Sequence, residues 1–511
     1  MAVYSAGGAC MEGSMASAAL TLPKPMPAGS PAVLSAEVSE RDLSPDLFEV
    51  AALALTLVTG LVGLTYEAAV DGLNVLVPMM LTTAMIYGSI RMLRRGAENL
   101  WTPVVWLRTA VAVFFGIGSL VPLFAGDDAR TYTESLFLFF PLDILKFNLV
   151  CVAFVLTILL TVGVGEWFSH RSGRKPLFAP KTSVLSLPTL GGLFLGVGSF
   201  VQLVLIMPSQ LGLNAIVWPA AVSEVGMTVY VGIYFLSNWA FRRGDYMIGV
   251  MLVITVFYMV LGLLSLSKTS VLLPVILFLL GYIVSKPTLG RIILAFSLVS
   301  LTFFLSNNVV QAGRFEIYQR YGSLGGAGIS ERIDMLRSIQ STKEVQVGGE
   351  VNFALIRLSY TNAGTYVIAQ YDNGIPGSSL SNAFYTMIPR VVWPGKPIIT
   401  DIARELSYAT TGIFENSITP SMPADAYWNQ GWIGVALWGV IAGLIFWGWS
   451  CYSIAVLRAE AWHLFPILLI GARLGTTVAG FLVSDLIGPL PVAIAGHFAL
   501  VGANALIRQR R

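Results

Sequence analysis

Long apolar stretches constrain the fold of this 511-residue chain more than any other feature. A helix that crosses the hydrocarbon core of a bilayer, about 30 Å thick, needs roughly 20 mostly apolar residues, because its backbone must form its hydrogen bonds internally. Charged residues make up only 12% of the chain, which excludes a cytosolic enzyme. The sequence therefore predicts an all-α polytopic membrane protein with about twelve transmembrane helices. The expected spans are 49–67, 73–90, 103–125, 142–165, 185–207, 221–241, 247–265, 269–285, 290–306, 430–452, 462–483 and 488–507.

Basic residues fall on alternate loops between these spans. The loops on one side, together with the C-terminus, carry 15 Lys and Arg residues, whereas the short loops on the other side carry only Arg130 and Lys268. Cytoplasmic loops concentrate Lys and Arg, so both termini are expected in the cytoplasm. Residues 1–48 are rich in Ala, Ser and Pro and have no signal-peptide pattern, so we expect a disordered cytoplasmic tail.

One interval breaks the rhythm of short loops. Residues 307–429 stay polar for over a hundred residues on the predicted outer side. In a protein whose other loops are short, a loop of this length is usually functional. The expected organisation is therefore the tail, a transmembrane bundle at 49–306, an outer catalytic or binding loop at 307–429, and a second bundle at 430–511.

The most specific string in the outer loop is IPRVVWPGKP, at residues 388–397. Its prolines fix φ and exclude helix, so Arg390, Trp393 and Lys396 are displayed from a stiff segment. Such stiffness lowers the ordering cost of binding a ligand. The alternative interpretation is a proline-rich connector with an interfacial tryptophan.

Two stretches before this string carry further candidates. RFEIYQRYGSLG begins at Arg314 and alternates Arg with aromatic residues, which suits a phosphorylated glycan because guanidinium groups bind phosphate bidentately. Ser330 is expected to cap a short helix, and residues 351–371 read as an amphipathic helix with Arg357 near its middle. For any single Arg here, a solvated and salt-bridged surface is the competing interpretation.

Two stretches after the string complete the set. Asp401 can start a helix that carries Arg404, and PADAYWNQGWIG places Asp425 and Trp428 where the chain re-enters the membrane. Asp425 or Glu415 could assist deprotonation of an acceptor hydroxyl, and the spacing does not select between them.

The order of these features resembles the Wzy-type O-antigen and exopolysaccharide repeat-unit polymerases. Multiple spans precede a long outer loop that holds the IPRxxWPxKP string, a Thr411-Gly412 turn and an AxWNxG-like string before the next span. Arg314 and Gly325 also satisfy the R-x10-G spacing noted in that family. The resemblance has motif-level detail over residues 245–440 and rests on the hydropathy profile elsewhere.

The resemblance implies a membrane glycosyltransferase of the C type at the periplasmic face of the bacterial inner membrane. Such an enzyme moves a growing glycan from undecaprenyl diphosphate to a new lipid-linked repeat unit, with no cofactor or metal, because fixed cations stabilise the departing diphosphate. Its expected partners are the bilayer, this lipid-linked oligosaccharide, a chain-length regulator and a flippase, but no nucleic acid. The expected catalytic residues are Arg390, Lys396, Asp425 and Glu415, and the expected substrate-binding residues are Arg314, Arg357, Arg404, Trp393, Lys268 and Trp428.

Two other functions compete with polymerisation. An O-antigen ligase shares the hydropathy profile but would be expected to use a His in its outer loop, and all three His lie outside that loop. A flippase or secondary transporter would fit twelve spans, but it predicts two related halves with paired broken helices, and the sequence has no convincing internal repeat.

Several ionisable residues fall within the predicted spans, where an unpaired charge costs several kcal/mol. Asp143 and Lys146 are three residues apart, so we expect them to neutralise each other on one helix face. Arg473 is expected either to have a buried structural partner or to lie near the lipid diphosphate. Arg108 and Asp485 also lie at the predicted membrane depth and are functional candidates by default.

Overall fold

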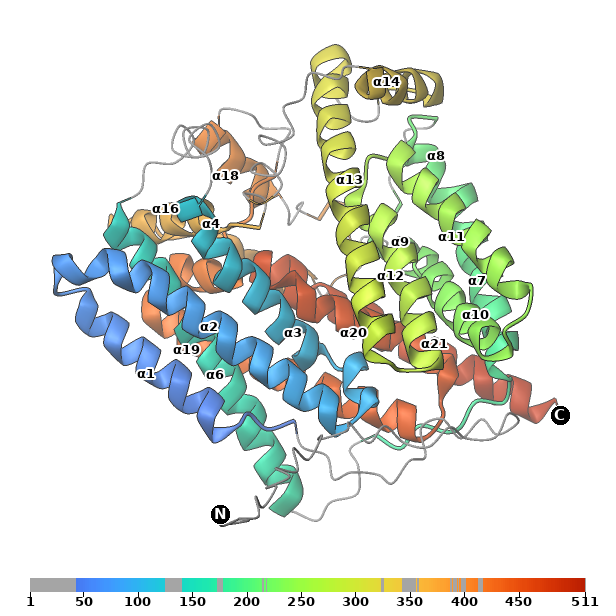
Figure 1. The fold of residues 1–511 in the computed structure, drawn as a ribbon, viewed down its shortest axis with the longest axis horizontal. Coiled ribbons are helices and arrows are strands. Elements are labelled where there is room, and N and C mark those ends of the chain that lie inside the picture. The colour runs from blue at the N-terminus through green and yellow to red at the C-terminus, as the bar shows by residue number, and fades with distance from the viewer. Residues whose placement is uncertain are drawn as a thin grey trace, which may run out of the picture. The chain divides into compact units, whose positions relative to one another are not determined.

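The computed structural model describes residues 43–124, 140–171, 178–213, 216, 218–322, 326–341, 355, 358–386, 388, 393, 395–396, 401–411 and 417–510, which lie in one compact unit. Every element in these ranges is a helix (Figure 1). Within the described ranges, ten helices are long and apolar enough to cross a membrane. The protein is an all-α, multi-pass membrane protein, and this part of the prediction is confirmed.

The N-terminal half of the described chain contains helices up to α12. They are α1 (Leu47–Gly63), α2 (Glu67–Arg95), η1 (Ala97–Trp101), α3 (Pro103–Val111), η2 (Ala112–Ile117), α4 (Gly118–Phe124), α6 (Pro141–Arg171), α7 (Leu187–Phe200), η3 (Val201–Ile206), α8 (Met207–Gln210), α9 (Ala220–Gly226), α10 (Thr228–Arg243), α11 (Met247–Leu264) and α12 (Lys268–Ser285). Helices α1 and α10 occupy two predicted spans but have only 17 and 16 residues, so the count of twelve spans stays a prediction.

The C-terminal half contains the remaining spans and the shorter helices between them. They are α13 (Leu289–Tyr321), α14 (Ile329–Ser341), α16 (Thr361–Asp372), η5 (Ser379–Asn382), α17 (Ala383–Thr386), α18 (Asp401–Thr411), α19 (Met422–Arg458), η6 (Trp462–Leu464), α20 (Phe465–Thr476), η7 (Thr477–Ala479), η8 (Leu482–Ile487) and α21 (Pro489–Gln509). The helix predicted to be capped by Ser330 is α14, but it already begins at Ile329, so Ser330 lies inside the helix and the predicted cap is wrong. The predicted helix at Asp401 is α18.

Helices α6 and α19 lie side by side and form the most extensive helix pair (Figure 1). Gly439 and Gly443 of α19 face Thr157 and Thr161 of α6, and a Cβ atom added to Gly443 would lie 2.6 Å from the Thr161 Cβ. Small residues four apart let two membrane helices approach closely. Helices α1, α2 and α16 also pack on α6. The α6–α19 pair therefore supports the polar cluster at the N-terminal end of α19, which is described below.

Some spans contain irregular turns. Ala112–Ile117 and Val201–Ile206 are π-helical, and such turns interrupt α-helices most often at functional sites. After α20 the chain passes through η7 and a non-helical turn at Gly480 before the π-helical turn of η8. Phe481 and Leu482 are buried, as irregular backbone at membrane depth must be unless it lines a water-filled cavity.

The helices that flank the predicted outer loop at 307–429 extend into that interval. Helix α13 continues to Tyr321 and α19 already begins at Met422, so the interval between these two helices is 322–421. Apolar composition ends at the membrane surface, but a helix that forms its own backbone hydrogen bonds can continue beyond it. The Arg-rich stretch from Arg314 to Tyr321 is therefore helical and continuous with a span.

Two other predicted segments are described only in part. Of the expected helix at 351–371, residues 351–354 and 356–357 lie outside the described residues, Leu355 is helical, and α16 begins at Thr361, whose N–H donates to Ser359 Oγ at 3.4 Å. At the N-terminus, Leu43 is buried and α1 starts at Leu47, so residues 43–48 belong to the fold and not to a tail. Residues 1–42 of the predicted tail lie outside the described residues.

Candidate functional site

The N-terminal end of α19 carries a buried carboxylate at the centre of a polar cluster. Asp425 has no exposed surface, and its Oδ1 accepts hydrogen bonds from Ser379 Oγ and from Asn429 Nδ2, the latter at 3.1 Å. Its Oδ2 accepts from the backbone N–H of Leu482 at 3.0 Å. Asn429 Nδ2 also donates to Ser379 Oγ at 2.7 Å. This Asp425 cluster joins α19 to η5 and η8, which are far apart in the sequence.

A second carboxylate stabilises the same break before η8. Asp485 Oδ2 accepts from the Phe481 N–H at 2.9 Å and from Ser484 Oγ at 2.7 Å. A Cβ atom on Gly480 would lie 2.2 Å from this oxygen, so only glycine fits beside it. The backbone N–H groups of Phe481 and Leu482 thus each donate to a carboxylate oxygen. Buried N–H groups without a helix partner need such an acceptor.

The described parts of the IPRVVWPGKP segment turn back on themselves. Lys396 is 9% exposed, and its Nζ donates to the backbone oxygen of Ile388 at 2.9 Å. The Lys396 N–H donates to the Trp393 oxygen at 3.2 Å, and the Trp393 ring meets Tyr385 of α17 edge-on at 5.3 Å between centroids. Helices η5 and α17 in turn pack on η8. The segment therefore adjoins an element that is fixed by the Asp425 cluster.

Lys146 of α6 does not pair with Asp143, and this prediction was wrong. Its Nζ forms an ion pair with Asp372 Oδ2 at the end of α16, and it lies 5.0 Å from the centre of the Tyr427 ring. Asp143 instead accepts from the Phe140 N–H at 3.2 Å, at the start of α6. The carboxylate at the helix N-terminus is stabilised by the free N–H groups there, which leaves Lys146 to a partner on another helix.

Arg314 and Lys268 lie together at the turn between α11 and α12. Arg314 Nε donates to the Leu266 oxygen at 2.8 Å, and Arg332 Nη1 donates to the Leu264 oxygen at 2.8 Å. Both guanidinium groups thus bind carbonyls at the C-terminal end of α11, where such groups lack helix partners. Lys268 Nζ donates to Asn307 Oδ1 at 2.6 Å. These contacts attach α13 and α14 to the bundle.

The remaining predicted site residues are scattered. Arg404 is exposed on α18 and lies 3.5 Å from Asp401, one turn earlier. Trp428 of α19 donates from Nε1 to the Ile375 oxygen at 3.2 Å. The positions that lie outside the described residues are Arg357, Arg390 and Glu415.

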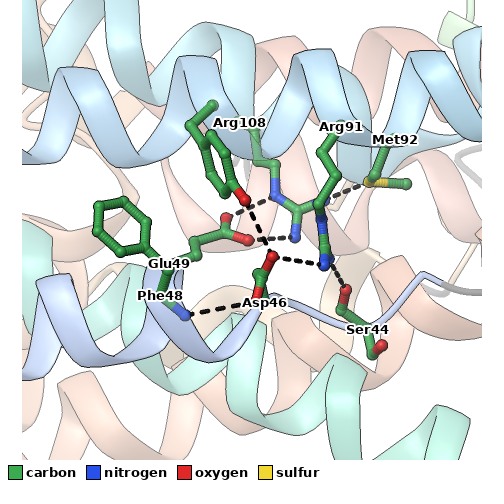
Figure 2. Close-up of polar contacts among 8 residues, drawn as sticks. Ser44, Asp46, Phe48, Glu49, Arg91, Met92 and Arg108 are labelled. Atoms are coloured by element: carbon green, nitrogen blue, oxygen red, sulfur yellow. Dashed lines mark hydrogen bonds and ion pairs between the residues drawn. The ribbon is translucent and has the colours of Figure 1, made fainter.

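A separate ionic cluster joins α1, α2 and α3 at their predicted cytoplasmic ends. Figure 2 shows Glu49 and Arg108 facing each other: Arg108 Nε lies 2.8 Å from Glu49 Oε1 and Nη2 lies 3.1 Å from Oε2, with both side chains 0% exposed. Beside this pair, Arg91 lies 3.1 Å from Asp46. A hydrogen bond from the Tyr87 hydroxyl, reinforced by Arg91, lowers the pKa of Asp46. Arg108 therefore has a partner that the sequence did not reveal.

Arg473 has a partner as well. Its Nη1 donates to both carboxylate oxygens of Glu224 in α9, at 3.1 Å each, and the pair lines a small pocket between α9, α10 and α20. The ion pair agrees with the structural alternative for this residue. Among the described residues, no group of three His, Cys, Asp or Glu side chains is placed to hold a metal ion.

Sequence reasoning missed the residues that complete these clusters. Ser379 and Asn429 organise Asp425, while Asp372 and Tyr427 surround Lys146. The only usable signal was that an intramembrane charge requires a partner, and that signal does not say where in the chain the partner lies.

Residues 221–476, half of the chain, match the model of a protein family described as a domain of unknown function, DUF8712. No curated protein and no solved structure matches the chain significantly. The matched region runs from α9 to α20 and so contains Asp425 with Ser379 and Asn429, as well as Lys396 and Arg314, whereas Leu482 of η8 lies beyond it.

Proposed function

The chain belongs to the DUF8712 family, and we propose that this member is an integral-membrane glycosyltransferase. It joins undecaprenyl-diphosphate-linked oligosaccharide repeat units into O-antigen or exopolysaccharide at the periplasmic face of the bacterial inner membrane. The observation that carries the proposal is the IPRVVWPGKP segment, which Lys396 closes through the Ile388 oxygen and whose Trp393 ring contacts Tyr385 of α17, a helix that packs on η8. The resemblance of this segment to the Wzy-type polymerases supplies the reaction.

In that reaction an acceptor hydroxyl oxygen forms a bond to the anomeric carbon of the donor glycan. The bond from that carbon to the lipid diphosphate breaks, and the diphosphate leaves with the electron pair while the hydroxyl loses its proton. Cationic side chains stabilise the charge that develops on the leaving group. We assign this role first to Arg390 and Lys396.

The two carboxylates proposed as bases differ in what supports them. Asp425 is enclosed and accepts hydrogen bonds from three donors, which suits a residue that positions η5 and η8 rather than one that accepts a proton from substrate. Glu415 keeps its place as the proposed base, and Glu415→Gln is the variant that tests it.

The decisive experiment is reconstitution of the purified protein with lipid-linked repeat units extracted from a host that lacks the gene. Wild type should produce a ladder of lengthened glycans, and Arg390→Ala should leave single repeat units. Lys396→Ala should be equally inactive, whereas Lys396→Arg keeps the charge and a donor for the Ile388 oxygen and should retain part of the activity. Equal membrane levels and equal melting temperatures are the controls.

Each alternative function has its own outcome in this system. Transfer of a finished glycan to lipid A core without lengthening would replace the polymerase by a ligase. Movement of lipid-linked sugar across the vesicle without lengthening would replace it by a flippase.

A further inference from the structure

The ion pair between Lys146 and Asp372 contacts the Tyr427 ring at the N-terminal end of α19, and this ring in turn contacts two further aromatic rings. The Tyr427 hydroxyl donates to Asp372 Oδ1 at 3.0 Å, while Lys146 binds the other carboxylate oxygen. The Tyr427 ring meets Tyr371 edge-on at 5.3 Å and Trp432 edge-on at 5.5 Å. These five residues, which we call the Asp372 site, come from three helices.

The backbone is shaped to admit this arrangement. Gly431 has a φ of +60° inside α19, a conformation that favours glycine, and it interrupts the helix between Tyr427 and Trp432. A Cβ atom on Gly431 would lie 2.9 Å from the Tyr371 hydroxyl oxygen. The kink therefore brings the end of α16 against α19 and sets Tyr371 beside Tyr427.

The charges in the site remain accessible. The Asp372 side chain is 39% exposed, that of Lys146 is 23% exposed, and Trp432 is 38% exposed. Lys146 neutralises the carboxylate, so the pair as a whole repels neither a neutral nor a weakly charged ligand. A partly exposed carboxylate between aromatic rings can still accept hydrogen bonds from hydroxyl groups.

We propose that the Asp372 site binds a neutral, hydroxyl-rich sugar ring of the oligosaccharide substrate. The apolar C–H face of such a ring packs on Trp432 and Tyr371, and its hydroxyls donate to Asp372. Ligand sites commonly combine aromatic side chains with a few polar groups in this way. The inference rests on the proposed function and adds to it a subsite on α6, α16 and α19, separate from IPRVVWPGKP.

The rival explanation is an aromatic belt that anchors helix ends at the lipid surface. Such a belt requires no ion pair among its rings and no hydrogen bond from Tyr427 to a carboxylate. Phe140, which directly precedes α6 and is 72% exposed, provides a matched control because it is an exposed aromatic residue at the same end of that helix and its side chain has no hydrogen-bonding group.

The test measures binding of oligosaccharides released by partial acid hydrolysis of the host polysaccharide to the full-length protein in nanodiscs, by saturation-transfer NMR and calorimetry. Asp372→Asn should weaken binding about tenfold, because it removes hydrogen bonds to a charged acceptor. Trp432→Ala should weaken it at least as much, Trp432→Phe should restore most of it, and Phe140→Ala should leave it unchanged.

Each result decides between the two explanations. Equal binding by wild type, Asp372→Asn and Trp432→Ala at equal thermal stability would overturn the subsite, as would an equal loss from Phe140→Ala. Polymerisation by wild type alongside such a result would remove the subsite but leave the polymerase. Oligosaccharide binding that depends on Asp372 in a protein that does not polymerise would support the subsite and remove the polymerase.

Discussion

The Glu49–Arg108 pair allows a quantitative test of how the bundle is held together. Both side chains are 0% exposed and joined by two hydrogen bonds, of 2.8 and 3.1 Å. Removing one partner of a fully buried ion pair leaves an uncompensated charge and costs about 3–5 kcal/mol, whereas replacing both by apolar residues of similar volume is roughly neutral or stabilising. We therefore expect Glu49→Leu and Arg108→Met to lose about 3–5 kcal/mol each and the double variant to recover most of that loss.

The assay is equilibrium unfolding of the purified protein in mixed micelles with increasing SDS fraction, followed by tryptophan fluorescence. Gly88→Ala provides an independent perturbation, because its Cβ would lie 2.5 Å from Glu49 Oε1 and 3.0 Å from Arg108 Nε. It should lower the free energy of unfolding without removing a charge. Arg91→Met is the matched control, since its ion pair with Asp46 is partly exposed and should contribute about 1 kcal/mol or less.

The reasoning fails if both single variants lie within about 0.5 kcal/mol of wild type, the range of ordinary surface substitutions. It also fails if the double variant loses as much as the two single variants combined. Additive losses would mean that the two side chains contribute independently and that the paired geometry in Figure 2 is not what stabilises them.

Three further predictions concern other parts of the bundle. Gly443→Ala should reduce the amount of folded protein in membranes, because the added Cβ would lie 2.6 Å from the Thr161 Cβ of α6. Gly448→Ala is the control, because a Cβ there meets nothing within 4 Å. Equal abundance of the two variants would contradict the close α6–α19 contact. Asp425→Ala should lower the free energy of unfolding by about 2–4 kcal/mol, because the buried donors of Ser379, Asn429 and Leu482 lose a charged acceptor. An unchanged SDS unfolding curve would show that the Asp425 cluster does not stabilise the fold. Because its folded-state pKa is lowered, Asp46 contributes stability above its unfolded pKa, near 3.9, that disappears as the pH falls through the folded value. Wild type should therefore melt above Asp46→Asn at pH 7, and the difference should shrink progressively as the pH falls below the unfolded pKa in the same detergent. A difference that does not shrink in acid would exclude the carboxylate bonded to Tyr87 as its source.

The helical class followed from the sequence because the bilayer permits few alternatives. A long uncharged stretch inside the bilayer must form its backbone hydrogen bonds within a helix. Loops on the cytoplasmic side carry more Lys and Arg than loops on the other side. The same argument does not fix helix ends in water. Arg314 follows a drop in hydropathy, yet α13 continues past it and uses its guanidinium to bind the Leu266 oxygen.

Partners of buried charges could not be predicted from spacing. Lys146 has Asp143 three residues away but pairs with Asp372, 226 residues along the chain. The spacing of two residues in one helix does not show which other groups compete for them. The Asp143 carboxylate accepts a hydrogen bond from the Phe140 N–H at the start of α6 instead of pairing with Lys146. A long-range pair depends on which helices pack together, and here α16 packs on both α6 and α19, with α19 kinked at Gly431.

The position of the carboxylates also explains how the short helices between α16 and α19 can be fixed in place. Elements such as η5 and α17 are too short to bury an apolar core of their own, so their order must come from contacts with the bundle. Asp425 provides that contact because one side chain binds Ser379 of η5 and the backbone of Leu482 in η8. A rigid element beside the IPRVVWPGKP segment is what an enzyme needs if cations are to be held in place before a charge develops on the leaving group.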